Sequence, residues 1–199
     1  MERIVFILAF VLSAYAQGQG FNLPTDYIRN SAQGNNIKWE KVEGSPYQYE
    51  TFKPGKLQIN DSTYTTQLRY NIYADEIEIQ EGSQNIFTVL KRAYIKVFIG
   101  KEKLGIHEYV SGDSVKQAYF LDLMDGANED DILLLKQLER TLVEAAKATS
   151  SYKKGSPPRI IKEQTYYLKI PGKPAELIKL NKRSILSVLG TKESKESSY

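Results

Sequence analysis

The chain has 199 residues and no cysteine; 41% of its residues are hydrophobic, 26% are charged, and the formal net charge is +3. This length fits one globular domain, and so small a charge gives little steering toward nucleic acid. The missing thiols exclude disulfides and cysteine-dependent catalysis. Aromatic residues make up 11% of the chain, with 14 tyrosines, a composition that favours β-structure.

The first sixteen residues have the layout of a secretory signal peptide. A short charged start precedes an apolar run, and Ala14 and Ala16 occupy the positions that a signal peptidase reads, which predicts cleavage before Gln17. A retained membrane anchor is the alternative, but a run of about ten residues is too short to cross ~30 Å of hydrocarbon. We therefore expect an exported protein, periplasmic or extracellular, with peripheral attachment to the outer membrane left open. We expect no transmembrane segment in the mature chain.

Composition changes divide the remaining chain. Residues 17–43 are polar and rich in Gly, Asn and Gln, which predicts a flexible lead with Trp39 as its anchor. Residues 44–190 carry regular hydrophobic patterns and are expected to form a single β-rich domain. Residues 191–199 are polar and charged, which predicts a disordered tail.

Alternating patterns and turn residues predict short antiparallel strands after Gly44. Residues 53–55 (Lys-Pro-Gly) and 60–62 (Asn-Asp-Ser) have turn chemistry, and Leu57 and Ile59 alternate with polar residues between them. A longer alternation runs from Tyr64 to Ile72, and its phase changes at Ala74–Asp75, which indicates a turn or bulge. Further strand patterns separated by turns continue to residue 123 and resume at 159–170. The expected fold is mainly β, an antiparallel meander or a partly closed barrel or sandwich.

Two segments near the C-terminus carry helical signals. Within Asp131–Lys147, a helical stripe fits Leu135, Leu138, Leu142 and Ala145, although Ile132–Leu135 also fits a short buried strand. Asn181 can cap one short helix from Lys182 to Leu189 that ends at Gly190.

A set of short segments resembles a family of small secreted proteins from Bacteroidota-type bacteria. The segments are, in order, Gly44–Tyr47, Leu57 with its hairpin turn, Leu68–Tyr73 with Glu76, Tyr119–Gly126, Leu133–Lys136, Tyr166–Leu168, and the Lys-rich helix with Leu186 and Leu189. The resemblance covers roughly residues 44–190 and implies a β-rich body behind a signal peptide. It favours a strand over Asp131–Leu138, and it implies no particular activity.

Two regions invite a metal-site hypothesis. His107 is the only histidine, and a lone histidine without cysteine seldom builds a zinc or copper site. Oxygen ligands for calcium are available in an acidic cluster: Asp122, Asp125, Asn128, Glu129, Asp130 and Asp131. Their spacing does not match the helix–loop–helix calcium loop, so we expect a solvated turn and neither a metal site nor a cofactor.

Carboxylates and tyrosines supply two further hypotheses. Asp75, Glu76 and Glu78 could be proposed as a glycosidase pair, but Glu76 and Glu78 share one strand face and are expected on its solvent side. Strand tyrosines could form a ligand face that stacks sugars or accepts a partner; the candidates are Tyr70, Tyr94, Tyr119 and Tyr167. The alternative is that these tyrosines belong to the core.

The sequence therefore predicts a compartment and a fold class more firmly than a function. No Gly-rich phosphate loop and no nucleophile elbow is present in the sequence. We expect a non-enzymatic exported protein that contacts another protein or a component of the cell envelope. The alternatives are a carbohydrate-binding module with a tyrosine-lined face and a hydrolase built from carboxylates.

Overall fold

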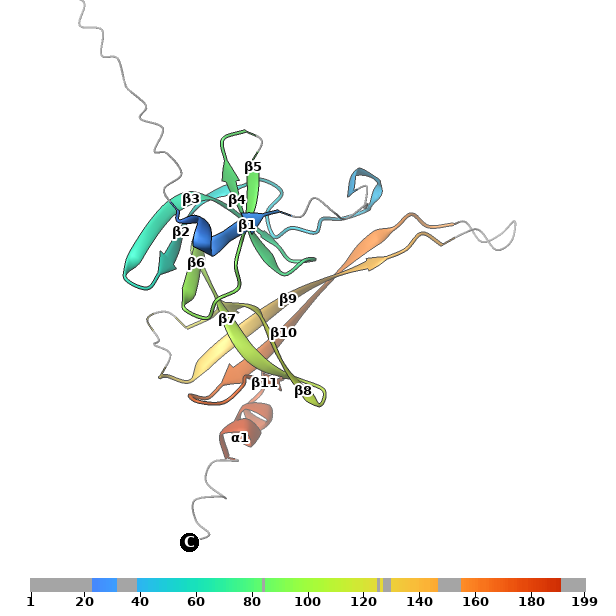
Figure 1. Ribbon diagram of the computed structural model, residues 1–199. Helices are drawn as coiled ribbons and strands as arrows, with labels where there is room; N and C mark the ends of the chain where they lie inside the picture. The colour runs from blue at the N-terminus through green and yellow to red at the C-terminus, as the bar shows by residue number, and fades with distance from the viewer. Residues whose placement is uncertain are drawn as a thin grey trace, which may run out of the picture.

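The computed structural model describes residues 23–31, 39–83, 85–124, 126, 130–146 and 155–190. Eleven strands form a single antiparallel sheet that is not closed, and one short helix follows at the C-terminal end (Figure 1). The prediction of a mainly β protein with one C-terminal helix is confirmed. The signal peptide and the tail predicted over 191–199 lie outside the described residues.

The strands follow one another along the sheet with one interruption. Their bounds are β1 (Ile28–Asn30), β2 (Lys53–Ile59), β3 (Ser62–Asn71), β4 (Glu76–Glu81), β5 (Asn85–Val89), β6 (Ile95–Ile99), β7 (Glu102–Ser111), β8 (Ser114–Asp122), β9 (Leu133–Val143), β10 (Arg159–Lys169) and β11 (Glu176–Ile178). Their order is β1-β5-β4-β3-β2-β6-β7-β8-β9-β10-β11. The chain thus leaves β5 and returns to the open side of β2, after which β6 to β11 form an uninterrupted meander.

The β2–β3 hairpin shows how the sequence sets the register. Asn60 takes a positive φ of 52° in the turn, a conformation that Asn tolerates well, and Leu57 lies opposite Tyr64. The turn predicted at residues 53–55 is wrong, because these residues begin β2. Gly55 serves close packing there, since a Cβ at this position would lie 2.5 Å from the carbonyl oxygen of Phe98.

The sheet buries side chains in two main clusters on opposite faces. The larger cluster lies among β2 to β8 and includes Leu57, Leu68, Tyr70, Ile77, Ile79, Val97, Leu104 and Tyr119. The smaller cluster contains Ala118, Phe120, Leu133, Leu135, Tyr167 and Ala175. Strand β8 contributes to both, because Tyr119 faces one cluster and its neighbour Phe120 faces the other.

The ambiguous segment Asp131–Lys147 is a strand. Strand β9 pairs with β10 over its full length, from Leu133 opposite Lys169 to Val143 opposite Arg159. In the strand, Leu135 and Leu138 point to opposite faces: Leu135 lies in the smaller cluster and Leu138 packs against the larger one. Pairing with a strand distant in sequence decides the conformation here, as the family resemblance suggested.

Near the C-terminus, α1 (Lys182–Gly190) begins and ends as predicted. The backbone N–H of Ser184 donates to Asn181 Oδ1 at 2.9 Å, and this bond caps the helix. Val188 packs with Leu168 and Ile178 in a third small cluster. Within the part of the chain that the structure describes, no helix has the length and apolarity needed to cross a membrane.

The N-terminal lead differs from the expectation at its described residues. The 3-10 helix η1 (Thr25–Tyr27) runs into β1, which pairs with β5 at the edge of the sheet. Leu23 is buried in the larger cluster, so apolar contact holds this segment in place despite its polar surroundings. Farther along, Trp39 in η2 (Trp39–Lys41) packs edge-on against Tyr73, with ring centroids 5.1 Å apart.

Candidate functional site

The four tyrosines proposed as a ligand face do not form an exposed row. Tyr70, Tyr119 and Tyr167 are 1%, 1% and 6% exposed, whereas Tyr94 is 45% exposed. Tyr70 and Tyr119 lie in the larger cluster and Tyr167 in the smaller one, on opposite faces of the sheet. Tyr70, Tyr119 and Tyr167 therefore belong to the core, which was the alternative expectation for these tyrosines.

Tyr70 and Tyr119 meet at the half-buried carboxylate of Asp75. The Tyr70 hydroxyl donates to Asp75 Oδ1 at 2.8 Å, and the Tyr119 backbone N–H donates to the same oxygen at 3.2 Å. The carboxylate also pairs with Lys91. Burial, and next the charge of Asp75, raises the pKa of both phenols above its ordinary value. Asp75 thus fixes the β3–β4 turn against β8.

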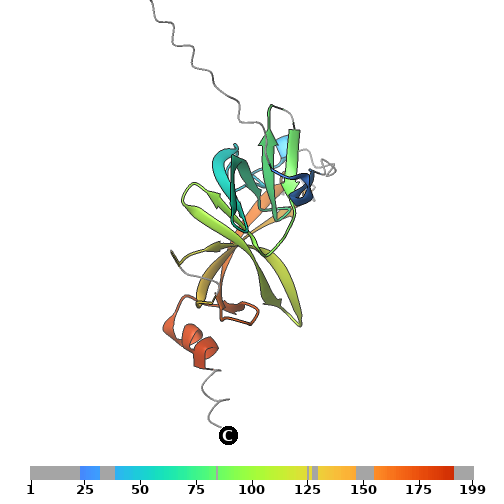
Figure 2. The ribbon, with the colours of Figure 1, turned by 60° about the vertical axis from the view of Figure 1, so that its left-hand side comes forward.

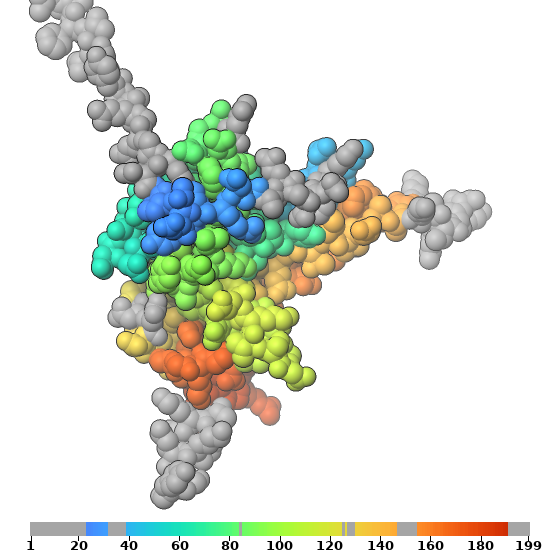
Figure 3. Space-filling view, in the orientation of Figure 1, coloured from blue at the N-terminus to red at the C-terminus, as the bar shows by residue number. Residues whose placement is uncertain are grey.

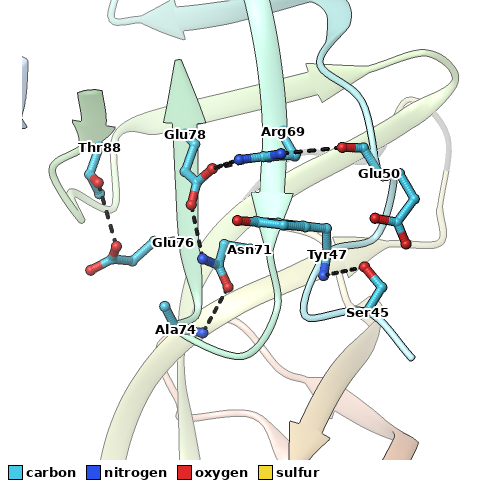
Figure 4. A network of polar contacts seen from close by, with 9 residues as sticks. All are labelled: Ser45, Tyr47, Glu50, Arg69, Asn71, Ala74, Glu76, Glu78 and Thr88. Atoms are coloured by element: carbon cyan, nitrogen blue, oxygen red, sulfur yellow. Dashed lines mark hydrogen bonds and ion pairs between the residues drawn. The ribbon is translucent and has the colours of Figure 1, made fainter. Parts of the chain in front are cut away.

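Glu78 and Arg69 form a buried ion pair on β4 and β3 (Figure 4). Glu78 Oε2 accepts from Arg69 Nη2 at 2.6 Å and from Nε at 3.0 Å, and Oε1 accepts from Asn71 at 2.9 Å. The Arg69 guanidinium lies 3.6 Å from the ring centroid of Tyr47 and 4.3 Å from that of Phe52. The predicted solvent position of Glu78 is therefore wrong, since the residue is 4% exposed.

A cation neutralises each of the three carboxylates proposed for catalysis. Lys91 pairs with Asp75, Arg29 with Glu76 and Arg69 with Glu78, and Thr88 also donates to Glu76. Carboxylate hydrolysis needs one protonated acid and one free base or nucleophile facing a cleft. The three pairs instead match structural roles: Asp75 holds the β3–β4 turn, Glu76 joins β4 to β1 through Arg29, and Glu78 holds Arg69 beside the segment of residues 45–52.

His107 lies beside a pocket of about 380 Å³ on the β6–β7–β8 surface, near the turn between β10 and β11. Its ring packs edge-on against Phe120 at 6.0 Å. The pocket also contacts Lys96, Lys103 and Lys169, which come from three different strands. The sequence suggested His107, Asp122 and Asp130 in separate hypotheses but not as neighbours, because strand pairing that the sequence does not specify brings them together.

The acidic cluster divides between a buried anchor and an exposed loop. Asp122 pairs with Lys103 at 2.7 Å and accepts from the Met124 backbone N–H at 3.1 Å. Asp130 and Asp131 are exposed, whereas Asp125, Asn128 and Glu129 lie outside the described residues. Over the residues described, no three His, Cys, Asp or Glu side chains are grouped so as to hold a metal ion.

The distal part of the β9–β10 ribbon projects from the body of the protein (Figures 1 and 3). Strand β8 pairs with β9 only at Lys136 and Leu135, and β11 pairs with β10 only over residues 166–168. Among the described residues, the distal ribbon has two isolated bridges: one joins Arg159 to Glu43, and the other lies within the ribbon, between Ala146 and Ser156. In the described residues, β9 beyond Lys136 and β10 before Tyr166 therefore have no further paired strand on their outer edges apart from the bridge to Glu43. Figure 2 shows the same sheet from a second direction, with α1 at the end away from β1 and β5.

Two pairs of like charges lie directly opposite each other in this ribbon. Glu139 faces Glu163 on one side of the ribbon, and Arg140 faces Lys162 on the other. Like charges in directly opposed positions are destabilising by a few tenths of a kcal/mol or more. Each face of the ribbon therefore carries one pair of like charges at this level, acidic on one face and basic on the other, a pattern that the separate strand sequences do not reveal.

Comparison of the chain with protein families, with curated proteins and with solved structures found no match.

Proposed function

We propose that this protein is exported and acts without catalysis, by binding another protein of the cell envelope through the distal β9–β10 ribbon. The layout of residues 1–16 supports export. The resemblance to small secreted proteins of Bacteroidota-type bacteria supports the same compartment and assigns no activity.

The observation that carries the binding proposal is the combination of open edges and opposed like charges. An open strand edge offers backbone donors and acceptors to an added strand, and β-sheet proteins usually protect such edges. The pairs Glu139–Glu163 and Arg140–Lys162 reduce the stability of the free ribbon. A partner strand with complementary charges would relieve that repulsion when it binds.

Site-specific photo-crosslinking tests this proposal in the native envelope. A photoreactive amino acid at Thr141, which is exposed on β9, is expected to capture one specific protein. The same group at Asp61, in the exposed β2–β3 turn, is the matched control. Adding Glu163→Lys to the Thr141 probe should reduce capture, because it removes the acidic pair.

Two results would contradict the proposal. Equal crosslinking patterns from positions 141 and 61 would show that the ribbon has no specific partner. Export is tested separately by the mass of the mature chain, which should begin at Gln17; an unprocessed protein retained in the cytoplasm would refute that part.

A further inference from the structure

The pocket beside His107 has the size and composition of a small-ligand site. Its volume of about 380 Å³ lies in the range of small-molecule pockets. Strand pairing builds it: Lys96 lies opposite Gly105, and Lys103 lies opposite Asp122. Lys169 and Gly172 close the pocket from the end of β10 and the turn that follows.

Gly105 keeps this pocket open. It is buried in β7 between Lys103 and His107, which extend from the same face of the strand. A Cβ atom at position 105 would lie 3.2 Å from His107 Nε2, so a larger side chain would occupy space that the pocket now provides. The glycine therefore offers a direct way to fill the site.

The charges around the pocket are balanced. Three cations, Lys96, Lys103 and Lys169, and three carboxylates, Glu108, Asp122 and Asp130, contribute to its lining. Their formal charges cancel, so the lining has no surplus charge to compensate for the desolvation of a small anion or cation. A ligand without net charge avoids that penalty.

The same groups provide hydrogen-bond donors and acceptors in one small space. Lysine ammonium groups donate, carboxylates accept, and the Gln117 amide does both. Two contacts help to hold these side chains in place: Lys103 with Asp122 at 2.7 Å, and Gln117 with Glu108 at 3.4 Å. Alcohol hydroxyl groups, which both donate and accept, match such a mixed lining.

The pocket also includes apolar surface. Leu133 belongs to its lining, and the His107 ring, which packs edge-on against Phe120, supplies a second apolar contact. A sugar ring combines hydroxyl groups at its edge with C–H groups on its faces. We propose that this pocket binds a small neutral saccharide, with hydroxyl groups toward the charged residues and a C–H face toward the apolar ones. The site lies at the end of β10 opposite the distal ribbon and does not depend on the ribbon's partner.

Calorimetric titration of the mature protein with neutral mono- and disaccharides of glucose, galactose, mannose and N-acetylglucosamine tests this proposal. We expect at least one to bind at one site, with less than about a twofold change in Kd between about 50 mM and about 500 mM salt, because a neutral ligand is not screened. Gly105→Leu and His107→Ala should each weaken binding by about tenfold or more, which corresponds to about 1.4 kcal/mol. Thr65→Ala, in a separate groove on β2 and β3, should leave Kd unchanged.

Three outcomes would overturn the saccharide assignment. They are the absence of binding by every sugar in the panel, binding that neither pocket substitution changes, and binding only by phosphate, citrate or uronic acids that weakens steeply with salt. If Gly105→Leu fails to fold, His107→Ala decides the result, because His107 is only half-buried and its removal leaves the strand intact.

Discussion

Neutralising Glu78 should destabilise the protein more than neutralising a glutamate that is exposed on another strand. Glu78→Gln keeps the shape of the side chain and removes its charge, so the Arg69 guanidinium loses its ion partner. The two side chains are 6% and 12% exposed, and water can therefore solvate the remaining cation only in part. Breaking a buried pair in this way costs about 3–5 kcal/mol.

The structure favours the lower end of that range. Arg69 still donates to the Glu50 carbonyl oxygen at 3.2 Å and still lies against the rings of Tyr47 and Phe52. We expect a loss of about 3 kcal/mol, which corresponds to a fall of about 1–2 M in the urea midpoint for an m-value of about 2 kcal/mol/M.

Urea unfolding followed by circular dichroism and by Trp39 fluorescence measures this loss. Glu176→Gln on the exposed edge strand β11 is the matched control and should change stability by less than about 0.5 kcal/mol. Adding Arg69→Met to Glu78→Gln should cause no further loss, because it removes the unpaired cation. Equal midpoints for Glu78→Gln and Glu176→Gln would refute the reasoning and show that Arg69 is well solvated.

Three further predictions concern buried phenols and the ribbon. Tyr70→Phe keeps the ring and removes the bond to Asp75, so unfolding free energy should fall by about 1–2 kcal/mol in urea titrations, against about 3–5 kcal/mol for Tyr70→Ala. Burial raises the folded-state pKa of Tyr70 and Tyr119 above the unfolded value near 10, so their contribution is complete below pH ~10 and declines as pH rises further; absorbance titration should show both ionising only with unfolding. Glu163→Lys places a positive charge opposite Glu139 and should raise the free energy of unfolding, measured by urea titration, by about 0.2–1 kcal/mol. A decrease would contradict the register of β9 and β10.

The alternation of apolar and polar residues predicted those strands that have one buried face and one exposed face. From Tyr64 to Tyr70 the side chains become more buried along one face, as expected from a period of two, and the phase change at Asp75 coincides with a turn in which φ is 53°. Asn181 also capped α1 as predicted, because a helix cap depends on residues three or four positions apart.

Features that depend on distant partners were not predictable in this way. Glu78 looked exposed because its alternation with Ile77 and Ile79 is that of a surface residue, yet Arg69 on the neighbouring strand stabilises it inside. The leucines of β9 suggested a helix because both faces of the strand are partly covered, which removes the period-two pattern. The pocket lining and the opposed charges of the ribbon both require the register, which no local signal contains.

The two-sided burial of β8 limits how the molecule can be divided. Tyr119 and Phe120 are adjacent and enter different clusters, so insertion or deletion of a single residue before them would exchange their environments. A fragment ending at β8 would leave Phe120 without Leu135 and Tyr167, and a fragment beginning at β9 would lack the other half of that cluster. Shortened versions for biophysical work should therefore keep both halves of the sheet and trim only outside Leu23 and Gly190.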